Sequence, residues 1–116
     1  MNFILHYGGD IKPGKARELQ KWLDANEKEY ANSMPEGTKY LGTYFPMYTS
    51  DKTGGGVHQL VQLDSYGAQD RLAEAGKIDG VFGKLQNELF SFFDEQSQNW
   101  TSALYKSVTD ATIFGE

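Results

Sequence analysis

The stretch VHQLVQLDSYGAQDRL, residues 57–72, decides the fold. Residues 57–63 alternate in the manner of a strand and contain the β-branched residues that strands favour. Asp64 or Ser65 can cap a helix that begins near Tyr66. The chain therefore passes from a strand directly into a helix, and the other elements can be placed around this unit.

The first half of the chain has the same order of elements. Residues 2–7 form a short strand candidate that Gly8 and Gly9 close. A helix follows from near Pro13, which suits a first helical turn because its missing N–H is not needed there. Helical spacing continues along one apolar stripe, which consists of Ala16, Leu19, Leu23, Asn26 and Tyr30. The sequence thus predicts a second strand-to-helix unit before residue 35.

Three further segments complete the pattern. Residues 38–48 suit a strand that ends near Pro46, since proline cannot donate to a sheet ladder. The helix after Tyr66 is interrupted at Gly76, and residues 102–109 form the last strand candidate. The stretch after Gly76 carries the strongest helical periodicity of the chain, in Ile78, Phe82, Leu85, Leu89 and Phe92.

The predicted order is β-α-β-β-α-β, the ferredoxin-like plan of the α+β class. All strands should be antiparallel, with the fourth next to the first, then the third and the second. Helices would cover one face of the sheet. The strands carry apolar residues at both parities, so a second copy of the chain should cover the other face. We expect one domain over residues 1–116 and a homodimer.

This layout resembles the dimeric α+β barrel superfamily, in which two ferredoxin-like protomers pack sheet against sheet. Residues 57–72 carry the most similar local feature, and NWTSALYKSV, residues 99–108, also fits. The superfamily includes cofactor-independent monooxygenases, haem-degrading enzymes, stress-responsive proteins, polyketide cyclases and the NIPSNAP- and EthD-like families. The resemblance is one of topology, so it assigns no catalytic residue here.

Composition excludes several classes of function. The net charge is −5, and the basic residues are scattered, which argues against nucleic acid and against a charged membrane surface. Cysteine is absent, so disulfides and thiolate sites are impossible. We expect no cofactor, no resident metal and no membrane span, and a cytoplasmic location follows as the default.

We expect the glycines at 54–56 to lie in a hairpin loop. A phosphate-binding loop needs its glycines between a strand and a helix, followed by Lys and Ser or Thr. Here the glycines lie between two predicted strands, and no such pair follows. Phosphate binding is therefore disfavoured.

The chain has two histidines, and antiparallel pairing of the first and third strands can bring them together. With His6 opposite His58, Phe3 would face Val61 and Leu5 would face Gln59, which separates an apolar face from a mixed one. The histidines could be hydrogen-bonded residues at a strand end, or substrate-binding and acid–base groups. A metal site with Asp10 as a third ligand is a weaker alternative.

Aromatic residues supply the remaining candidates. Tyr40, Tyr44 and Tyr48 share one parity, so they should form a row that lines a dimer interface or a pocket. Trp100 precedes the last strand and can close a pocket or pack against a second subunit. Phe90 and Phe93 widen the apolar face of the last helix toward a pocket or a second subunit. We expect Tyr40, Tyr44, Trp100 and Phe82 to bind the ligand.

These features predict a homodimer with an aromatic-lined pocket between sheet and helices that binds an apolar or aromatic small molecule. An enzyme of this kind would be a cofactor-independent monooxygenase or cyclase-like protein, with His6 and His58 as catalytic residues. The alternative is a non-catalytic ligand-binding or stress-related homodimer in which both histidines are structural.

Overall fold

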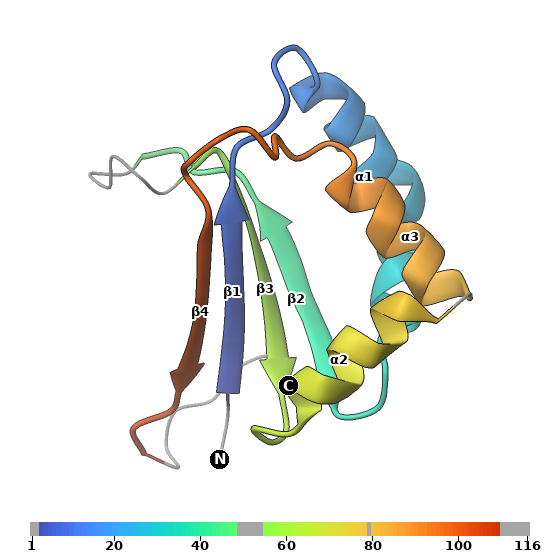
Figure 1. Cartoon of the computed structure of the whole chain (residues 1–116), viewed down its shortest axis with the longest axis vertical. Coiled ribbons are helices and arrows are strands. Elements are labelled where there is room, and N and C mark those ends of the chain that lie inside the picture. The colour runs from blue at the N-terminus through green and yellow to red at the C-terminus, as the bar shows by residue number, and fades with distance from the viewer. Residues whose placement is uncertain (1–2, 49–54, 79, 110–116) are drawn as a thin grey trace.

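The computed structural model describes residues 3–48, 55–78 and 80–109. Its elements follow the predicted order, with the second helix broken in two (Figure 1). They are β1 (Phe3–Gly9), α1 (Ala16–Asn32), β2 (Thr38–Tyr44), β3 (Val57–Leu63), α2 (Ala68–Lys77), α3 (Val81–Phe90) and β4 (Thr101–Lys106). β2 ends two residues before Pro46, as the missing proline donor requires.

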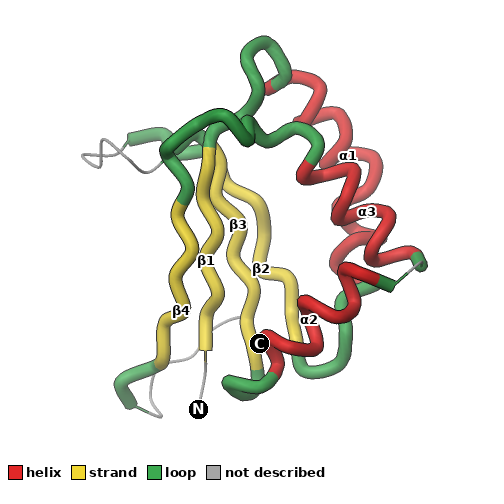
Figure 2. Tube along the Cα trace, in the orientation of Figure 1, coloured by secondary structure: helices red, strands yellow, loops and turns green. Residues whose placement is uncertain are grey.

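The four strands form one antiparallel sheet in the order β2-β3-β1-β4, which confirms the predicted topology. All three helices lie on the same side of this sheet (Figure 2). We call this side the helix face and the opposite side the open face. No described element covers the open face.

The core lies between the sheet and the helices. Residues 57, 59, 61 and 63 of β3 are buried, and the residues between them are partly exposed, so β3 has a clear helix face. Tyr30 of α1 is buried at the centre, where its ring stacks on Phe82 with centroids 5.5 Å apart. Its hydroxyl accepts a hydrogen bond of 3.0 Å from Nε2 of the buried Gln59.

The predicted register of β1 against β3 is wrong by two residues. His58 lies opposite Gly8, and His6 lies opposite Leu60. A shift of two residues leaves every side chain on its predicted face, because the side-chain period of a strand is two. The separation into an apolar helix face and a mixed open face is therefore confirmed. The predicted register also places Asn2 opposite Gln62, but Asn2 lies outside the described residues.

The predicted row of tyrosines on one face is also wrong. A β-bulge at Leu41 shifts the pairing of β2, so that Tyr40 lies opposite Val61 and Tyr44 lies opposite His58. An extra residue in one strand reverses the faces that follow it. Tyr40 consequently packs on the helix face and Tyr44 lies on the open face.

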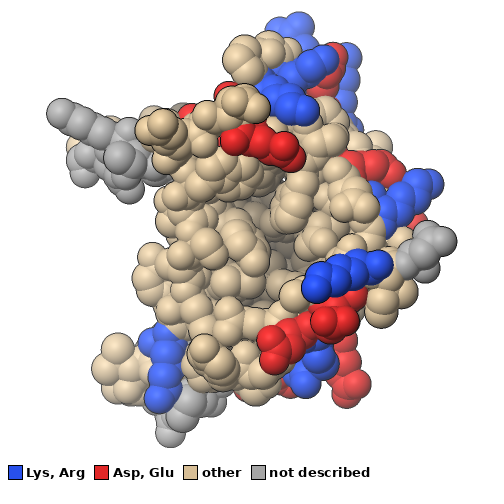
Figure 3. Space-filling view, viewed as in Figure 1, with Lys and Arg blue, Asp and Glu red and all other residues tan. Residues whose placement is uncertain are grey.

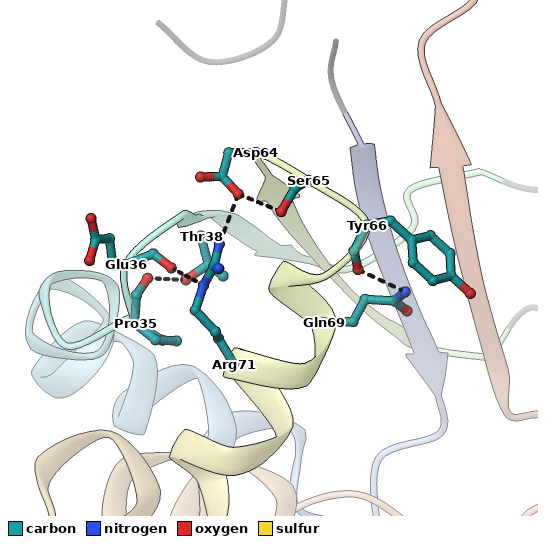
Figure 4. A network of polar contacts seen from close by, with 8 residues as sticks. All are labelled: Pro35, Glu36, Thr38, Asp64, Ser65, Tyr66, Gln69 and Arg71. Atoms are coloured by element: carbon teal, nitrogen blue, oxygen red, sulfur yellow. Dashed lines mark hydrogen bonds and ion pairs between the residues drawn. The ribbon is translucent and has the colours of Figure 1, made fainter.

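The strand-to-helix junction of the quoted stretch is held by Arg71 (Figure 4). Its guanidinium donates to Asp64 Oδ1 at 3.0 Å and to the backbone oxygen of Glu36 at 2.9 Å. Gly37 beside it has a φ of +83°, and a Cβ there would lie 2.3 Å from the Arg71 side chain. The junction thus ties α2 to the ends of both β2 and β3.

The glycine loop joins β2 to β3, as predicted, and does not open a helix. Gly55 and Gly56 are described and Gly54 is not. The Gly56 N–H donates to the Gly9 oxygen at 2.9 Å, which extends the contact between β3 and β1. Among the described residues, no helix is long and apolar enough to cross a membrane.

Replacing Tyr30 with Phe should destabilise the protein by about 1–3 kcal/mol, because the buried Gln59 amide loses its partner. The double variant Tyr30→Phe, Gln59→Leu should lose less free energy of unfolding than the sum of the losses in the two single variants. Urea unfolding of the four proteins in this cycle measures both quantities. A Tyr30→Phe variant as stable as the wild type would contradict the importance of this bond.

Candidate functional site

The two histidines meet on the open face of the sheet. His6 Nε2 and His58 Nδ1 are 2.8 Å apart, and the ring centroids are separated by 5.0 Å. The rings lie diagonally across β1 and β3, since His58 is opposite Gly8. The predicted proximity is confirmed. One imidazole donates and the other accepts, so the hydrogen bond requires an unprotonated nitrogen in the pair.

Two tyrosines frame this pair. Tyr105 of β4 stacks near His6 with a centroid distance of 6.5 Å. Tyr44 of β2 lies opposite His58, and its hydroxyl donates to the Leu41 oxygen at 2.6 Å. Its ring lies over Gly42, where a Cβ would be 2.7 Å from the Tyr44 hydroxyl oxygen. Tyr44 is therefore held beside the histidines, as expected for a supporting residue.

Burial lowers the pKa of His6 below its ordinary value of 6.5, and the neighbouring His58 charge lowers this pKa further. His6 is consequently neutral at pH 7. Among the described residues, no group of three or more His, Asp or Glu side chains is arranged to hold a metal ion. Proton exchange and hydrogen bonding are within the chemistry of this histidine pair.

Tyr40 and Phe82 do not join the histidines. The Tyr40 hydroxyl donates to Glu27 Oε2 at 2.7 Å and lies 2.5 Å from Thr43 Oγ1 on the helix face. Burial raises the pKa of Tyr40 well above its ordinary value. Phe82 is only 6% exposed and stacks on Tyr30 in the core. Both residues stabilise the protomer rather than line the site with the histidines.

A cavity of about 410 Å³ lies on the helix face, between the strands β1 and β4 and the end of α3. Figure 3 shows the surface hollowed between the strands and the helices. The walls of the cavity are mainly aromatic. The residues that line it are Tyr7, Phe90, Phe93, Glu95, Trp100, Thr101 and Ser102. The predicted pocket between sheet and helices is therefore present, with Trp100 in its wall.

The wall of this cavity is held by the end of β1. Asp10 Oδ2 accepts hydrogen bonds from Ser97 Oγ at 2.6 Å and from Asn99 Nδ2 at 2.9 Å. These bonds, of which the Ser97 bond is the larger cause, lower the pKa of Asp10. Trp100 follows directly and packs against Gly9, where a Cβ would lie 3.1 Å from the indole. Its ring centroid is 5.8 Å from that of Phe93.

A second cavity of about 390 Å³ adjoins the first and shares Tyr7 and Phe90 with it. Its other lining residues are Leu5, Gln69, Asp70, Leu72, Ala73 and Gln86. The two cavities are therefore neighbours between the sheet and the helices α2 and α3, and we call them together the groove. One part is aromatic and the other contains amide and carboxylate groups.

The predicted site thus divides into two places. The histidines and Tyr44 lie on the open face, whereas Trp100 lines the cavity on the helix face. The expectation that the histidines supply the polar groups of the pocket is wrong. Both histidines lie on the open face of the sheet, whereas the pocket lies on the helix face. Their catalytic role stays a prediction. Phe90 and Phe93 line the pocket. Of the two predicted reasons for the wide apolar face, a pocket or a second subunit, the pocket is therefore observed.

Tyr7 lines the cavity, although the sequence patterns did not predict it there, and the same holds for Glu95, Thr101 and Ser102. The available signal for Tyr7 was its parity, which places it with Leu5 on the helix face of β1. Gly9, two residues later, carries no side chain and leaves space for the Trp100 indole. A tyrosine next to such a gap can reach a cavity.

Lowering the pH from about 7.5 to 5.5 should destabilise the wild type more than His6→Gln. The unfolded chain protonates His6 near pH 6.5, whereas the folded protein resists this, because the folded pKa is lowered. The contribution of His6 to the stability of the folded protein is therefore fully present above pH 6.5. It is lost as the pH falls through the pKa of His6 in the folded protein. Thermal unfolding followed by circular dichroism at several pH values measures the difference, and equal pH profiles would refute this account.

Comparison with solved structures identifies the fold. The chain is similar to a NIPSNAP family protein from Agrobacterium tumefaciens, with a TM-score of 0.68 and 12% identity over 96% of this chain and 89% of the other. A NIPSNAP-like domain protein from Burkholderia xenovorans gives a TM-score of 0.68 at 9% identity, with coverages of 98% and 91%. A conserved protein from Methanosarcina mazei gives 0.60 at 17% identity, with coverages of 91% and 92%.

No protein-family model matches the sequence, and no curated protein matches it either. The likeness to the solved structures covers nearly the whole chain at low identity, so it concerns the fold. The chain has the protomer fold that these NIPSNAP-family and NIPSNAP-like proteins share.

Proposed function

We propose that this protein is a homodimeric barrel protein that binds an uncharged apolar or aromatic small molecule in the groove of each protomer. The observation that carries the proposal is the cavity of about 410 Å³ walled by Tyr7, Phe90, Phe93 and Trp100. Cavities of this size, lined mainly by aromatic groups and a few polar ones, are typical of small-molecule sites. Among the described residues that line this cavity, Glu95 is the one charged residue.

The composition of the open face supports the proposed homodimer. None of the described strands contains Asp or Glu, and the open face presents Ile4, Leu60, Ala103, Tyr105 and Tyr44 around the histidines. A surface with aromatic and apolar groups and few charges resembles the core of a subunit interface. The fold is also that of a superfamily of dimers. A second copy of the chain is therefore the occupant that we propose for this face.

The placement of the histidines favours the non-catalytic form of this proposal. A ligand in the groove contacts the helix face of β1, while His6 and His58 project from the open face, where the second copy would cover them. A paired, neutral imidazole with a hydrogen-bonded partner can be buried at an interface without an unpaired polar group.

Proton transfer by the histidines is the second candidate function. The bond of 2.8 Å between the rings and the lowered pKa of His6 favour it, since they keep a basic nitrogen available at neutral pH. A cofactor-independent monooxygenase or a cyclase could use such a base on a phenolic or enolic substrate. This function requires the substrate to reach the open face rather than the groove.

Filling the cavity should abolish ligand binding. Ser102→Phe places a ring among the cavity walls and should weaken the binding of naphthalene at least about tenfold. Gln20→Phe, on an exposed position of α1, is the matched control. In a Trp22→Phe background, Trp100 is the sole tryptophan, so its fluorescence reports binding directly.

The variant His6→Gln separates the two candidate functions in the same assay. Naphthalene binding should stay within about twofold of the wild type, because His6 lies on the other face. Loss of binding in His6→Gln together with normal binding in Ser102→Phe would place the ligand on the open face and favour the catalytic candidate.

Leu60→Glu should convert the proposed dimer to a monomer, because it places a charge at the centre of the open face. Light scattering should give a mass of about twice 13.0 kDa for the wild type and a mass near 13.0 kDa for the variant. Ala25→Glu adds the same charge at an exposed position of α1 and should stay dimeric. A monomeric wild type would exclude the homodimer.

A further inference from the structure

Tyr7 occupies the junction of the groove. It lines both cavities, and of the lining residues only Phe90 does the same. Tyr7 lies between Gln59 of β3 and Ser102 of β4 on the helix face of the sheet. A ligand that extends from the aromatic part of the groove to its polar part must therefore pass this side chain.

The Tyr7 hydroxyl has no hydrogen-bond partner in the part of the chain that the structure describes. The hydroxyls of Tyr30, Tyr40 and Tyr44 all have one, respectively with Gln59, Glu27 and Leu41. Burial raises the pKa of Tyr7, so its hydroxyl stays protonated and can donate. A half-buried tyrosine ordinarily finds a partner for its hydroxyl. Here the groove is the place from which a partner can come.

The two parts of the groove differ in chemistry. Phe90, Phe93 and Trp100 provide ring faces for an aromatic group on one side of Tyr7. Gln69 and Gln86 provide amides on the other side. The acidic groups at the groove are Glu95 and Asp70, and no Lys or Arg is among the described residues that line it. This charge pattern disfavours an anionic ligand.

We propose that Tyr7 determines the specificity of the groove by donating a hydrogen bond to the carbonyl oxygen of an uncharged aromatic ketone. The aromatic ring of the ligand lies against Phe93 and Trp100, and its carbonyl carbon lies beside Tyr7. The substituent beyond the carbonyl extends toward Gln69 and Gln86. This inference rests on the proposed ligand-binding function, which it refines to a chemical class.

Two probes of nearly equal shape test the inference. 2-Acetylnaphthalene has the carbonyl, and 2-ethylnaphthalene replaces it with a methylene group. The full-length wild type should bind the ketone about 3- to 10-fold more tightly, which is the usual range for one net hydrogen bond. The 2-naphthoate anion should bind more weakly than the ketone. Titration calorimetry measures all three dissociation constants.

Tyr7→Phe removes the hydroxyl alone, so the dissociation constants of the ketone and of 2-ethylnaphthalene should become about equal. The affinity for 2-ethylnaphthalene should stay within about twofold of the wild-type value. Tyr66→Phe is the matched control, since it removes an exposed tyrosine hydroxyl from a residue that lines neither cavity. It should retain the full preference. Tyr7→Phe breaks no hydrogen bond within the described chain, so it should fold like the wild type.

The outcomes separate this inference from the function on which it rests. If neither naphthalene binds, the proposed ligand-binding function is overturned and the role of Tyr7 falls with it. If both bind the wild type equally, or if Tyr7→Phe keeps the preference, binding stands and the role of Tyr7 is overturned.

An infrared measurement on the wild type requires no variant. The carbonyl band of bound 2-acetylnaphthalene should lie at lower wavenumber than in a hydrocarbon solvent, since donation to the oxygen weakens the C=O bond. A band at the hydrocarbon value would overturn the hydrogen bond.

Discussion

The antiparallel register of β1 against β3 is the constraint on which the rest of the structure depends. Successive side chains of a strand point to opposite faces, so a slip of one residue would turn the helix-face side chains of the slipped strand to the open face. Burial enforces the register, because Val57, Gln59, Val61 and Leu63 are each no more than 2% exposed. The same register directs Tyr7 into the groove and His6 toward His58.

The chain continues beyond β1 and pairs with the segment that follows α3, and this pairing shapes the groove. Ile11 pairs with Phe93, the Lys12 N–H donates to the Phe92 oxygen, and the Asp94 N–H donates to the Asp10 oxygen. These bonds attach the segment after α3 to the end of β1. That segment contains Phe93 and leads to Trp100, so the backbone pairing sets the width of the groove. A cavity wall held by backbone bonds keeps its shape without a ligand.

Local patterns predicted the elements, their order and the faces of β1 and β3, because helix and strand periods are properties of short stretches. The two-residue register error left those faces intact, and only side-chain packing distinguishes the alternatives. The bulge at Leu41 escaped prediction, although an isolated glycine within a strand, here Gly42 with φ of +134°, is its usual signal. The pocket was predicted as a type, but the assignment of His6 to it was wrong, although the predicted faces of β1 already separated His6 from the apolar helix face.

The sheet acts as a partition between two surfaces with different chemistry. Tyr7 and His6 are adjacent in sequence, yet their side chains are separated by the thickness of the backbone. Ligand contacts in the groove therefore reach the histidine pair only through β1 itself. Because side chains on opposite faces share no contact, substitutions on one face should act nearly independently of those on the other. A protein with this arrangement can keep its subunit interface constant while the groove, and with it the ligand, changes.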